Sequence, residues 1–312
     1  MLGNNIKQEA GVDVALAGAA SGFMTRFICQ PLDVIKIRFQ LQVEPISHRH
    51  SGKYRSFFHA AVTMFHEEGV SSLWKGHVPA QLLSISYGTI QFYTYNKLME
   101  YSKNENLPND WQHVRQFIAG AAAGSLATVM SFPFDTVRTR LVAQSSNSKI
   151  YTSHLSAYIT MLKNESTKSL FRGLSPTLIQ IAPHTGLQFF LYNLLTNICE
   201  SFHNENDDNT KKILISMIAG SLSGLLSKTA IYPFDLARKR LQIQGFENGR
   251  IGFGKFFTCH SLIDCLIKTF KDEGITGLFK GLLPSQIKAA SSTALHFTFY
   301  EQALLLLKHI RL

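Results

Sequence analysis

The chain has 312 residues, 45% of them hydrophobic, and its mean hydropathy of +0.03 suits either a large soluble domain or a membrane protein with a polar interior. Its formal net charge of +10 at pH 7 favours a negatively charged partner, which could be nucleic acid, anionic lipid or a phosphorylated small molecule. The four cysteines have no CxxC spacing, so we expect neither a metal site nor a disulfide framework.

The first dozen residues, MLGNNIKQEAGV, carry one lysine, no arginine and no apolar run. This composition excludes a secretory signal and argues against a cleaved organellar presequence. We therefore expect any targeting information to lie further along the chain.

One pattern of residues occurs three times, at intervals of about a third of the chain. In each copy a proline is followed by an aspartate and then by two basic residues: PLDVIKIR from Pro31, PFDTVRTR from Pro133 and PFDLARKR from Pro233. A pair of glycines four residues apart precedes each block. An aromatic residue, a basic residue and a glycine follow it, at 74–76, 171–173 and 279–281. Three landmarks in the same order indicate a tandem repeat.

Each repeat contains two apolar segments separated by a polar stretch, and each segment reaches the ~20 residues that a helix needs to cross a bilayer. The six segments are roughly 11–37, 77–99, 113–140, 174–199, 212–240 and 282–306. We predict an all-α membrane protein of six transmembrane helices with pseudo-threefold symmetry. It forms a single domain, 1–312, with repeats at approximately 11–106, 107–205 and 206–312.

The connections between the segments predict the orientation of the helices. The three long connections are rich in Lys and Arg, whereas the short ones near 100–112 and 200–211 are mainly acidic. The positive-inside rule places the long connections, and the ends of the helices that precede them, on the inner side of the membrane. Within these connections, 57–65 and 262–270 alternate apolar and polar residues at helical spacing, which predicts short helices at the membrane surface.

The repeated PxDxx[KR]x[KR] block, with Glu-Gly at 68–69 and 273–274 and an aromatic-[KR]-Gly after it, resembles the signature of the mitochondrial carrier family over nearly the whole chain. The resemblance implies a multi-pass carrier of the mitochondrial inner membrane that works by alternating access and binds cardiolipin. Within the family, 39–42, 74–81 and 227–229 are most similar to the branch that carries thiamine pyrophosphate. We expect a monomer.

Charged residues at the inner end are expected to form a gate. Proline removes a backbone hydrogen bond and kinks a helix, so the three repeated prolines should tilt three helices together. The Asp and the first basic residue of each block share a helix face, and the six can form a ring of three interhelical ion pairs: Asp33, Lys36, Asp135, Arg138, Asp235 and Arg238. The resemblance implies that this ring closes the inner end. It also implies glutamine braces, which Gln40 and Gln242 match, while the middle repeat has Val142. We call this set the matrix gate.

At the outer end, the family places an aromatic residue and an acid ahead of a cation. The matching positions here read Tyr95-Asn96 to Met99, Tyr192-Asn193 to Thr196 and Tyr300-Glu301 to Leu304. We therefore expect an outer gate without ion pairs.

Helical geometry locates the candidate substrate contacts. The positions seven residues before the gate aspartates lie almost two turns, about 10 Å, further from the gate on the same face; they are Arg26, Thr128 and Lys228. On the second helix of each repeat, the family contacts substrate at positions that read Leu83, Gln180 and Lys288 here, with Tyr87 and His184 one turn further on. Three cations, an amide and an aromatic face suit an anion that combines phosphates with a heteroaromatic ring.

Thiamine pyrophosphate, taken up in exchange for nucleotides or thiamine monophosphate, is the substrate that the resemblance favours. Coenzyme A and adenine nucleotides have the same chemistry and stay open as alternatives. A basic, soluble, helical nucleic-acid-binding protein is the alternative from another class, but the basic residues are spread over three loops rather than gathered beside stacking aromatics. We find no nucleophile–base pairing and no metal cluster, so we predict neither enzymatic activity nor a cofactor.

Overall fold

The computed structural model describes residues 2–44, 52–103, 112–145, 150–201, 209–250 and 256–311, and within these ranges the chain is helical without strands. Six long helices cover the six predicted apolar segments: α1 (Leu2–Leu41), α3 (His77–Lys103), α4 (Gln112–Ala143), α6 (Leu174–Ser201), α7 (Asn209–Gln242) and α9 (Leu282–Arg311). The all-α organisation in three similar repeats is therefore confirmed.

Each repeat also has a shorter helix between its two long ones: α2 (Phe57–Glu68), α5 (His154–Asn164) and α8 (Leu262–Leu278). A serine caps each of them by accepting a hydrogen bond from the backbone N–H three residues later: Ser56, Ser153 and Ser261. The helices predicted at 57–65 and 262–270 are confirmed as helices, and α5 is their counterpart in the middle repeat. Three short 3-10 helices complete the described elements: η1 (Val70–Trp74), η3 (Thr167–Phe171) and η4 (Glu247–Arg250).

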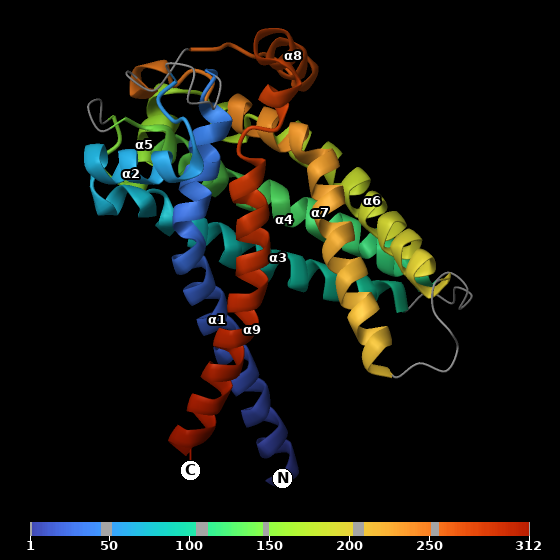
Figure 1. Cartoon of the computed structure of the whole chain (residues 1–312). Helices are drawn as coiled ribbons and strands as arrows, with labels where there is room; N and C mark the ends of the chain where they lie inside the picture. Colours follow the sequence, from blue (N-terminus) through green and yellow to red (C-terminus); the bar gives the residue numbers. More distant parts are fainter. Residues whose placement is uncertain are drawn as a thin grey trace.

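The long helices lie in three pairs, each of which joins neighbouring repeats: α1 with α9, α3 with α4, and α6 with α7. In Figure 1 the pairs converge at the top of the view, where α2, α5 and α8 lie, and diverge toward the other end. The chain ends lie at the diverging end, on α1 and α9. The fold therefore has a closed end formed by the loops and the PxD blocks, and an open end.

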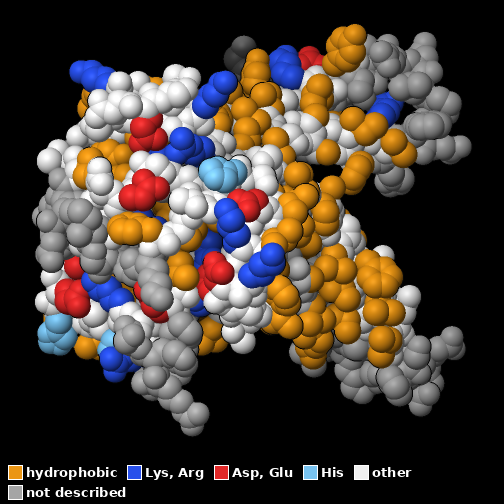
Figure 2. Space-filling view, turned by 90° about the horizontal axis from the view of Figure 1, so that it is seen from above, with side chains coloured by type: hydrophobic (Ala, Val, Ile, Leu, Met, Phe, Trp, Pro, Cys, Tyr) orange, Lys and Arg blue, Asp and Glu red, His pale blue; other side chains and the backbone are white. Residues whose placement is uncertain are grey.

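The closed end holds the main buried core. Side chains from all three repeats pack there, including Leu41, Tyr54, Met64, Met161 and Phe246. Further along the long helices, many large apolar side chains are exposed instead; examples are Phe23, Phe92, Phe117, Phe189, Met217 and Phe297. Figure 2, which looks onto the closed end, shows charged side chains gathered over it and apolar ones along the projecting helices.

By length and apolar composition, one stretch of the described helices qualifies as a candidate membrane span, Val114–Ala143. Charged residues interrupt the apolar sequence of other long helices, such as Arg26 in α1 and Lys228 in α7. Composition thus supports one of the six predicted spans.

A hydrogen bond from Trp74 compensates for the proline inside α1. Pro31 lies inside α1 and has no N–H, so the carbonyl of Phe27, four residues earlier, lacks its usual helical donor. The indole Nε1 of Trp74 donates to that carbonyl at 3.1 Å. The proline therefore frees an acceptor that ties the second half of the first repeat to α1.

The glycine pairs that precede the three blocks have open space at most of their positions. A Cβ atom added to Gly18, Gly22, Gly120 or Gly224 would meet nothing within 4 Å beyond the neighbouring backbone. These glycines lie where the helix pairs diverge, so no partner helix approaches them in this conformation. At the other two positions a tyrosine of the partner helix approaches: an added Cβ would lie 3.7 Å from the Tyr87 hydroxyl at Gly124 and 3.9 Å from Cε2 of Tyr192 at Gly220.

Candidate functional site

The six charged residues of the matrix gate come together at the closed end and form three ion pairs. Each pair joins the aspartate of one repeat to the basic residue of the next, at 2.6 Å for Asp33–Arg138, 2.7 Å for Asp135–Arg238 and 3.2 Å for Asp235–Lys36. The last pair is the longest and the most exposed, with side-chain exposures of 25% and 17%. The ring closes around the threefold axis because α1, α4 and α7 each supply one acid and one base.

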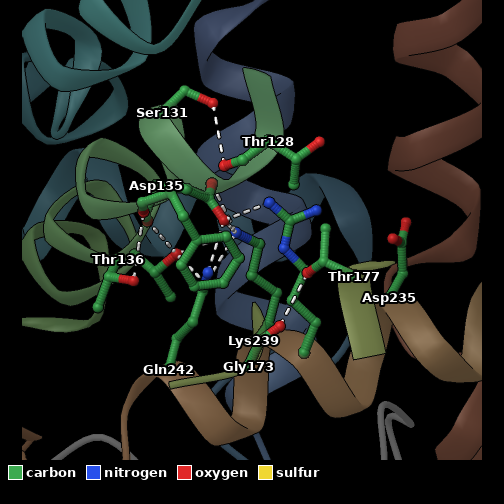
Figure 3. Close-up of polar contacts among 12 residues, drawn as sticks. Thr128, Ser131, Asp135, Thr136, Gly173, Thr177, Asp235, Lys239 and Gln242 are labelled. Atoms are coloured by element: carbon green, nitrogen blue, oxygen red, sulfur yellow. Dashed lines mark hydrogen bonds and ion pairs between the residues drawn. The ribbon is translucent and has the colours of Figure 1, made fainter. Parts of the chain in front are cut away.

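Asp135 has the densest set of partners among the gate carboxylates. Besides Arg238, it accepts hydrogen bonds from Lys239 Nζ at 2.8 and 2.9 Å and from Gln242 Nε2 at 2.6 Å. Figure 3 shows Lys239 and Gln242 converging on Asp135, while Asp235 lies apart from this cluster. Gln242 thus contacts the ion pair as a brace would.

Lys239 is a gate residue that was not predicted. Lys239 stands between the two basic positions of its block, where the other repeats have Ile37 and Thr139. Its Nζ also donates to Thr139 Oγ1 at 3.0 Å, and its side chain is 10% exposed. The extra cation in the third block was the signal that could have revealed it.

Gln40 does not brace an ion pair, contrary to expectation. Its Nε2 donates to the hydroxyl of Tyr232 at 3.0 Å instead. Tyr232 in turn donates to the backbone carbonyl of Lys280 at 2.9 Å, and Lys36 lies over its ring at 5.7 Å from the centroid. The amide of Gln40 is therefore bound to the phenol of Tyr232 rather than to a gate carboxylate.

Two of the predicted substrate contacts bind gate aspartates directly. Lys288 Nζ lies 2.7 Å from Oδ1 and 2.8 Å from Oδ2 of Asp33. Gln180 Nε2 lies 3.3 Å from Oδ1 of Asp235. The equivalent position of the first repeat is Leu83, whose side chain has no donor.

A second set of three ion pairs lies next to the matrix gate. Each of them joins two parts of the same repeat. The second basic residue of each block binds an acid in the following loop: Arg38 with Glu68, Arg140 with Glu165, and Arg240 with Glu273. These three guanidinium groups are at most 2% exposed. Burial raises the pKa of Glu68, but hydrogen bonds and charge from Arg38 and Lys75 outweigh it and lower the pKa to about 2.

A cavity of about 590 Å³ lies between α1, α3 and α9 and brings two of the predicted cations together. Arg26 and Lys288 both line it, with Gln81, Ser84 and His296 as further polar groups that the sequence analysis did not single out. We call it the phosphate cavity. Nη1 of Arg26 is buried and has no hydrogen-bond partner among the described residues. A buried donor nitrogen without a partner is costly, so an anion bound here would satisfy it.

The other predicted contacts line two smaller cavities. Leu83, Tyr87 and Thr128 line one of about 350 Å³, which Arg26 also borders. Gln180, His184 and Lys228 line one of about 360 Å³ next to Asp235. Lys228 and Arg26, which occupy equivalent positions in their repeats, thus line different cavities, and Lys228 Nζ donates to the carbonyl of Ser285 at 2.9 Å. Of the three predicted substrate cations, Arg26 and Lys288 share a cavity.

At the diverging end, the expected outer gate contains no ion pair between the matching positions of the described residues. Lys97 binds Glu100 on its own helix at 2.8 Å, and both side chains are largely exposed. Glu301 is exposed. The two ends of the helix bundle therefore differ in charge pairing.

Comparisons with known proteins agree with this architecture. A family model described as mitochondrial carrier protein matches residues 8–106, 110–202 and 209–310. The mitochondrial thiamine pyrophosphate carrier of Bos taurus is 40% identical over 306 residues, which cover 97% of this chain and 95% of that protein. The human protein of the same name is 41% identical over 305 residues, 96% of this chain and 92% of the relative.

A plant relative extends the similarity. Mitochondrial thiamine diphosphate carrier 1 of Arabidopsis thaliana is 36% identical over 321 aligned positions, with 95% of this chain and 94% of the relative covered. The family matches fall on the three repeats and cover nearly the whole chain. The chain therefore belongs to the mitochondrial carrier family, and it is a solute transporter of the mitochondrial inner membrane rather than an enzyme.

Proposed function

We propose that this chain carries thiamine pyrophosphate into the mitochondrial matrix. The observation that carries the proposal is the phosphate cavity, which is lined both by Lys288 and by Arg26, whose buried Nη1 has no hydrogen-bond partner among the described residues. Two cations at one cavity match a diphosphate, whose oxygens accept several charge-assisted hydrogen bonds. The names of the similar animal, fungal and plant proteins support the same substrate.

The rest of the substrate is an organic cation with two heteroaromatic rings. The neighbouring cavity, lined by Leu83, Tyr87 and Thr128, shares Arg26 with the phosphate cavity. A tyrosine ring offers a stacking face, and a leucine offers an apolar wall. The diphosphate would thus lie between Arg26 and Lys288, with the rings directed toward Tyr87.

The six long helices span the membrane in this proposal. Their exposed apolar side chains face lipid, and the charged residues that lower their hydropathy face the cavities or the gate, as intramembrane charges generally do. The basic loops and α2, α5 and α8 lie on the matrix side. The conformation with an intact matrix gate and diverging outer ends is then the one open to the intermembrane space.

Transport proceeds by alternating access, with nucleotides or thiamine monophosphate as exchange substrates. The chain acts as a monomer, because one chain supplies all three gate ion pairs. Cardiolipin is the proposed lipid partner. A cavity of about 630 Å³ lies beside the starts of α9 and α2, next to Lys280. A second cavity, of about 510 Å³, lies beside the starts of α6 and α8, next to Arg172. Helix N-termini with nearby basic side chains suit a phosphate headgroup.

Uptake of labelled compounds into liposomes that hold the purified protein tests the proposal. The panel contains thiamine pyrophosphate, thiamine monophosphate, coenzyme A, ATP and unphosphorylated thiamine, each with and without internal nucleotide. Saturable uptake of thiamine pyrophosphate that exceeds that of the other compounds supports the assignment. Preferential uptake of coenzyme A or ATP, or of unphosphorylated thiamine, contradicts it.

A further inference from the structure

We propose that Cys259 and Cys265 form a reversible redox pair, in which a peroxide oxidises Cys259 and Cys265 then closes a disulfide. Cys259 lies two residues before Ser261, the serine that caps α8, and Cys265 lies four residues after it. Both side chains are buried, and both thiols are free in this structure. The two thiols share a hydrogen bond, so their sulfur atoms are neighbours.

This thiol pair occurs in the third repeat alone. The residues at the equivalent positions are Tyr54 and Ala60 in the first repeat and Tyr151 and Ala157 in the second. In all three repeats a glutamine side chain accepts a hydrogen bond from the backbone N–H of the first residue, at 2.9, 2.8 and 3.1 Å. The backbone is thus held alike, and the two thiols of the third repeat take the places of a phenol and a methyl group.

A threonine replaces the contact that the tyrosines make. In the first two repeats the tyrosine hydroxyl accepts a hydrogen bond from the second basic residue of the block, at 2.7 and 3.4 Å. In the third repeat Nη1 of Arg240 donates to Oγ1 of Thr269 at 2.8 Å instead. Cys259 is therefore not needed as an acceptor for Arg240. Packing does not require Cys265 either, because alanine fills its position in both other repeats.

The two thiols differ in access. Cys259 lines the cavity of about 510 Å³ beside the starts of α6 and α8, and a small oxidant can reach it there. Cys265 does not line this cavity; it is 0% exposed and packs with Ala237 and Leu241 of α7. Access therefore makes Cys259 the thiol that reacts first and Cys265 the thiol that reacts second.

Hydrogen bonding and charge favour the same order. The thiolate, not the thiol, is the nucleophile. The hydrogen bond from Cys265 and the charge of Arg240 lower the pKa of Cys259 against the effect of burial, whereas the hydrogen bond to Cys259 and burial raise the pKa of Cys265. A cysteine of lowered pKa beside a second thiol is typical of reversible redox sites.

The reaction needs hydrogen peroxide as the oxidant. The thiolate of Cys259 attacks one peroxide oxygen, so that an S–O bond forms, the O–O bond breaks, and hydroxide leaves and is protonated to water. Cys265 then gives up its proton, and its sulfur attacks Sγ of Cys259; the S–S bond forms and a second water leaves. Two thiols lose two electrons and two protons, and one peroxide becomes two waters. Two molecules of glutathione reverse the change and leave as glutathione disulfide.

Mapping of the cysteines in the whole protein tests the proposal. The protein is purified in a neutral detergent without added cardiolipin, since a lipid headgroup in the cavity would cover Cys259. It is treated with hydrogen peroxide, blocked with N-ethylmaleimide and digested with trypsin, which leaves both cysteines on one peptide, 256–268. After oxidation, this peptide should lack two hydrogen atoms and carry no maleimide, and glutathione should restore both thiols. Cys29, which lines the phosphate cavity without a thiol partner among the described residues, should react about tenfold more slowly.

Two single substitutions test the order of reaction. In Cys265→Ser, oxidation should stop at the sulfenic acid of Cys259, which dimedone traps. In Cys259→Ser, Cys265 should keep its thiol at the same dose of peroxide. If either serine variant fails to fold, the alanine variant takes its place, and the mapping of the parent needs no variant.

Four results would overturn the redox pair. These are a parent that keeps both thiols, a parent that forms sulfinic acid at Cys259 without a disulfide, a disulfide that glutathione does not reduce, and oxidation of Cys265 at the parental rate in Cys259→Ser. None of these measurements involves thiamine pyrophosphate, so their outcome is independent of the proposed substrate.

Discussion

The guanidinium of Arg240 donates a hydrogen bond from Nε to the backbone carbonyl of Gln40, 3.1 Å away, and so joins the third repeat to the first. The other repeats have the same link, from Arg38 to Val142 at 2.8 Å and from Arg140 to Gln242 at 3.2 Å. Each arginine also binds the acid in its own loop. These residues therefore connect the surface helices to the next repeat, one layer outside the matrix gate.

Loss of one loop acid should destabilise this layer. In Glu68→Gln the buried Arg38 keeps its charge but loses the matching carboxylate, and removal of one partner of a buried ion pair costs about 3 kcal/mol or more. We expect a clear fall in the thermal unfolding temperature of the purified protein. Glu67→Gln is the matched control, because Glu67 is half exposed and its ion pair with Lys53 lies at the surface. An equal fall in both variants would contradict this role of Glu68.

The lowered pKa of Glu68 predicts that its contribution to stability does not change with pH near neutrality. The pKa of Glu68 is lowered to about 2, so its stabilisation is fully present above its ordinary pKa near 4.5 and is lost only as the pH falls toward 2. The stability difference between the parent and Glu68→Gln should therefore stay constant between about pH 5.5 and 8. A difference that shrinks as the pH falls through 7 toward 6 would show that another titrating group controls this layer.

Substitutions of the cavity cations should reveal which of them bind phosphate. Arg26→Ala and Lys288→Ala should each weaken thiamine pyrophosphate transport, because removal of a charged donor to a desolvated phosphate costs ~1.5 to 3 kcal/mol, or roughly tenfold to a hundredfold in affinity. Lys228→Ala should have a smaller effect, since Lys228 lines a different cavity and is bound to the Ser285 carbonyl. Unchanged transport in both Arg26→Ala and Lys288→Ala would show that the phosphate cavity is wrongly assigned.

A glycine of the repeated motif should tolerate no side chain. Gly281 has φ +84°, and an added Cβ would lie 2.9 Å from the carbonyl oxygen of Lys36 and 2.8 Å from the Tyr232 hydroxyl. Gly281→Ala should therefore cost about 2 kcal/mol or more and lower the unfolding temperature. Gly224→Ala, in open space inside α7, should be neutral or slightly stabilising. The opposite order would contradict the packing seen here.

The sequence predicted what depends on repetition and failed where one repeat differs from the others. Asp33, Asp135 and Asp235 occupy equivalent positions in the three repeats, so the repeat pattern predicted that they lie in one ring. The contact of Lys239 with Asp135 and the contact of Gln40 with Tyr232 each occur in a single repeat. Both contacts depend on which side chain the neighbouring repeat supplies. Lys228 and Arg26 are equivalent in sequence but border different cavities, because the helix pairs diverge rather than enclose one round space.

Cardiolipin should stabilise the protein more than a neutral lipid does. The cavities beside Gly281 and Gly173 combine helix starts with basic side chains, which attract a headgroup with two phosphates and net negative charge more strongly than a zwitterionic headgroup with one phosphate. The unfolding temperature in detergent should rise with added cardiolipin and less with phosphatidylcholine. Arg55→Ala, at the edge of the larger cavity, should reduce the rise. Equal stabilisation by both lipids would argue against specific sites.

The two gates should hold their closed states with unequal strength. The matrix gate has three ion pairs and further donors from Lys239, Gln242 and Lys288. The outer positions contain Asn96 and Asn193 in place of acids. Charge-assisted hydrogen bonds in a poorly solvated site contribute more than neutral ones. The substrate-free protein should therefore rest mainly with its matrix gate closed and its cavity open to the intermembrane space.

Labelling of a cysteine at Leu83 from each side of the membrane measures this balance. The parent should label faster from the intermembrane-space side. Asp135→Asn should shift labelling toward the matrix side, because it removes the carboxylate that binds Arg238, Lys239 and Gln242. Asn96→Ala and Asn193→Ala should leave the ratio nearly unchanged, because neutral side chains at the outer end contribute little to closure. Faster labelling of the substrate-free parent from the matrix side would refute the predicted asymmetry.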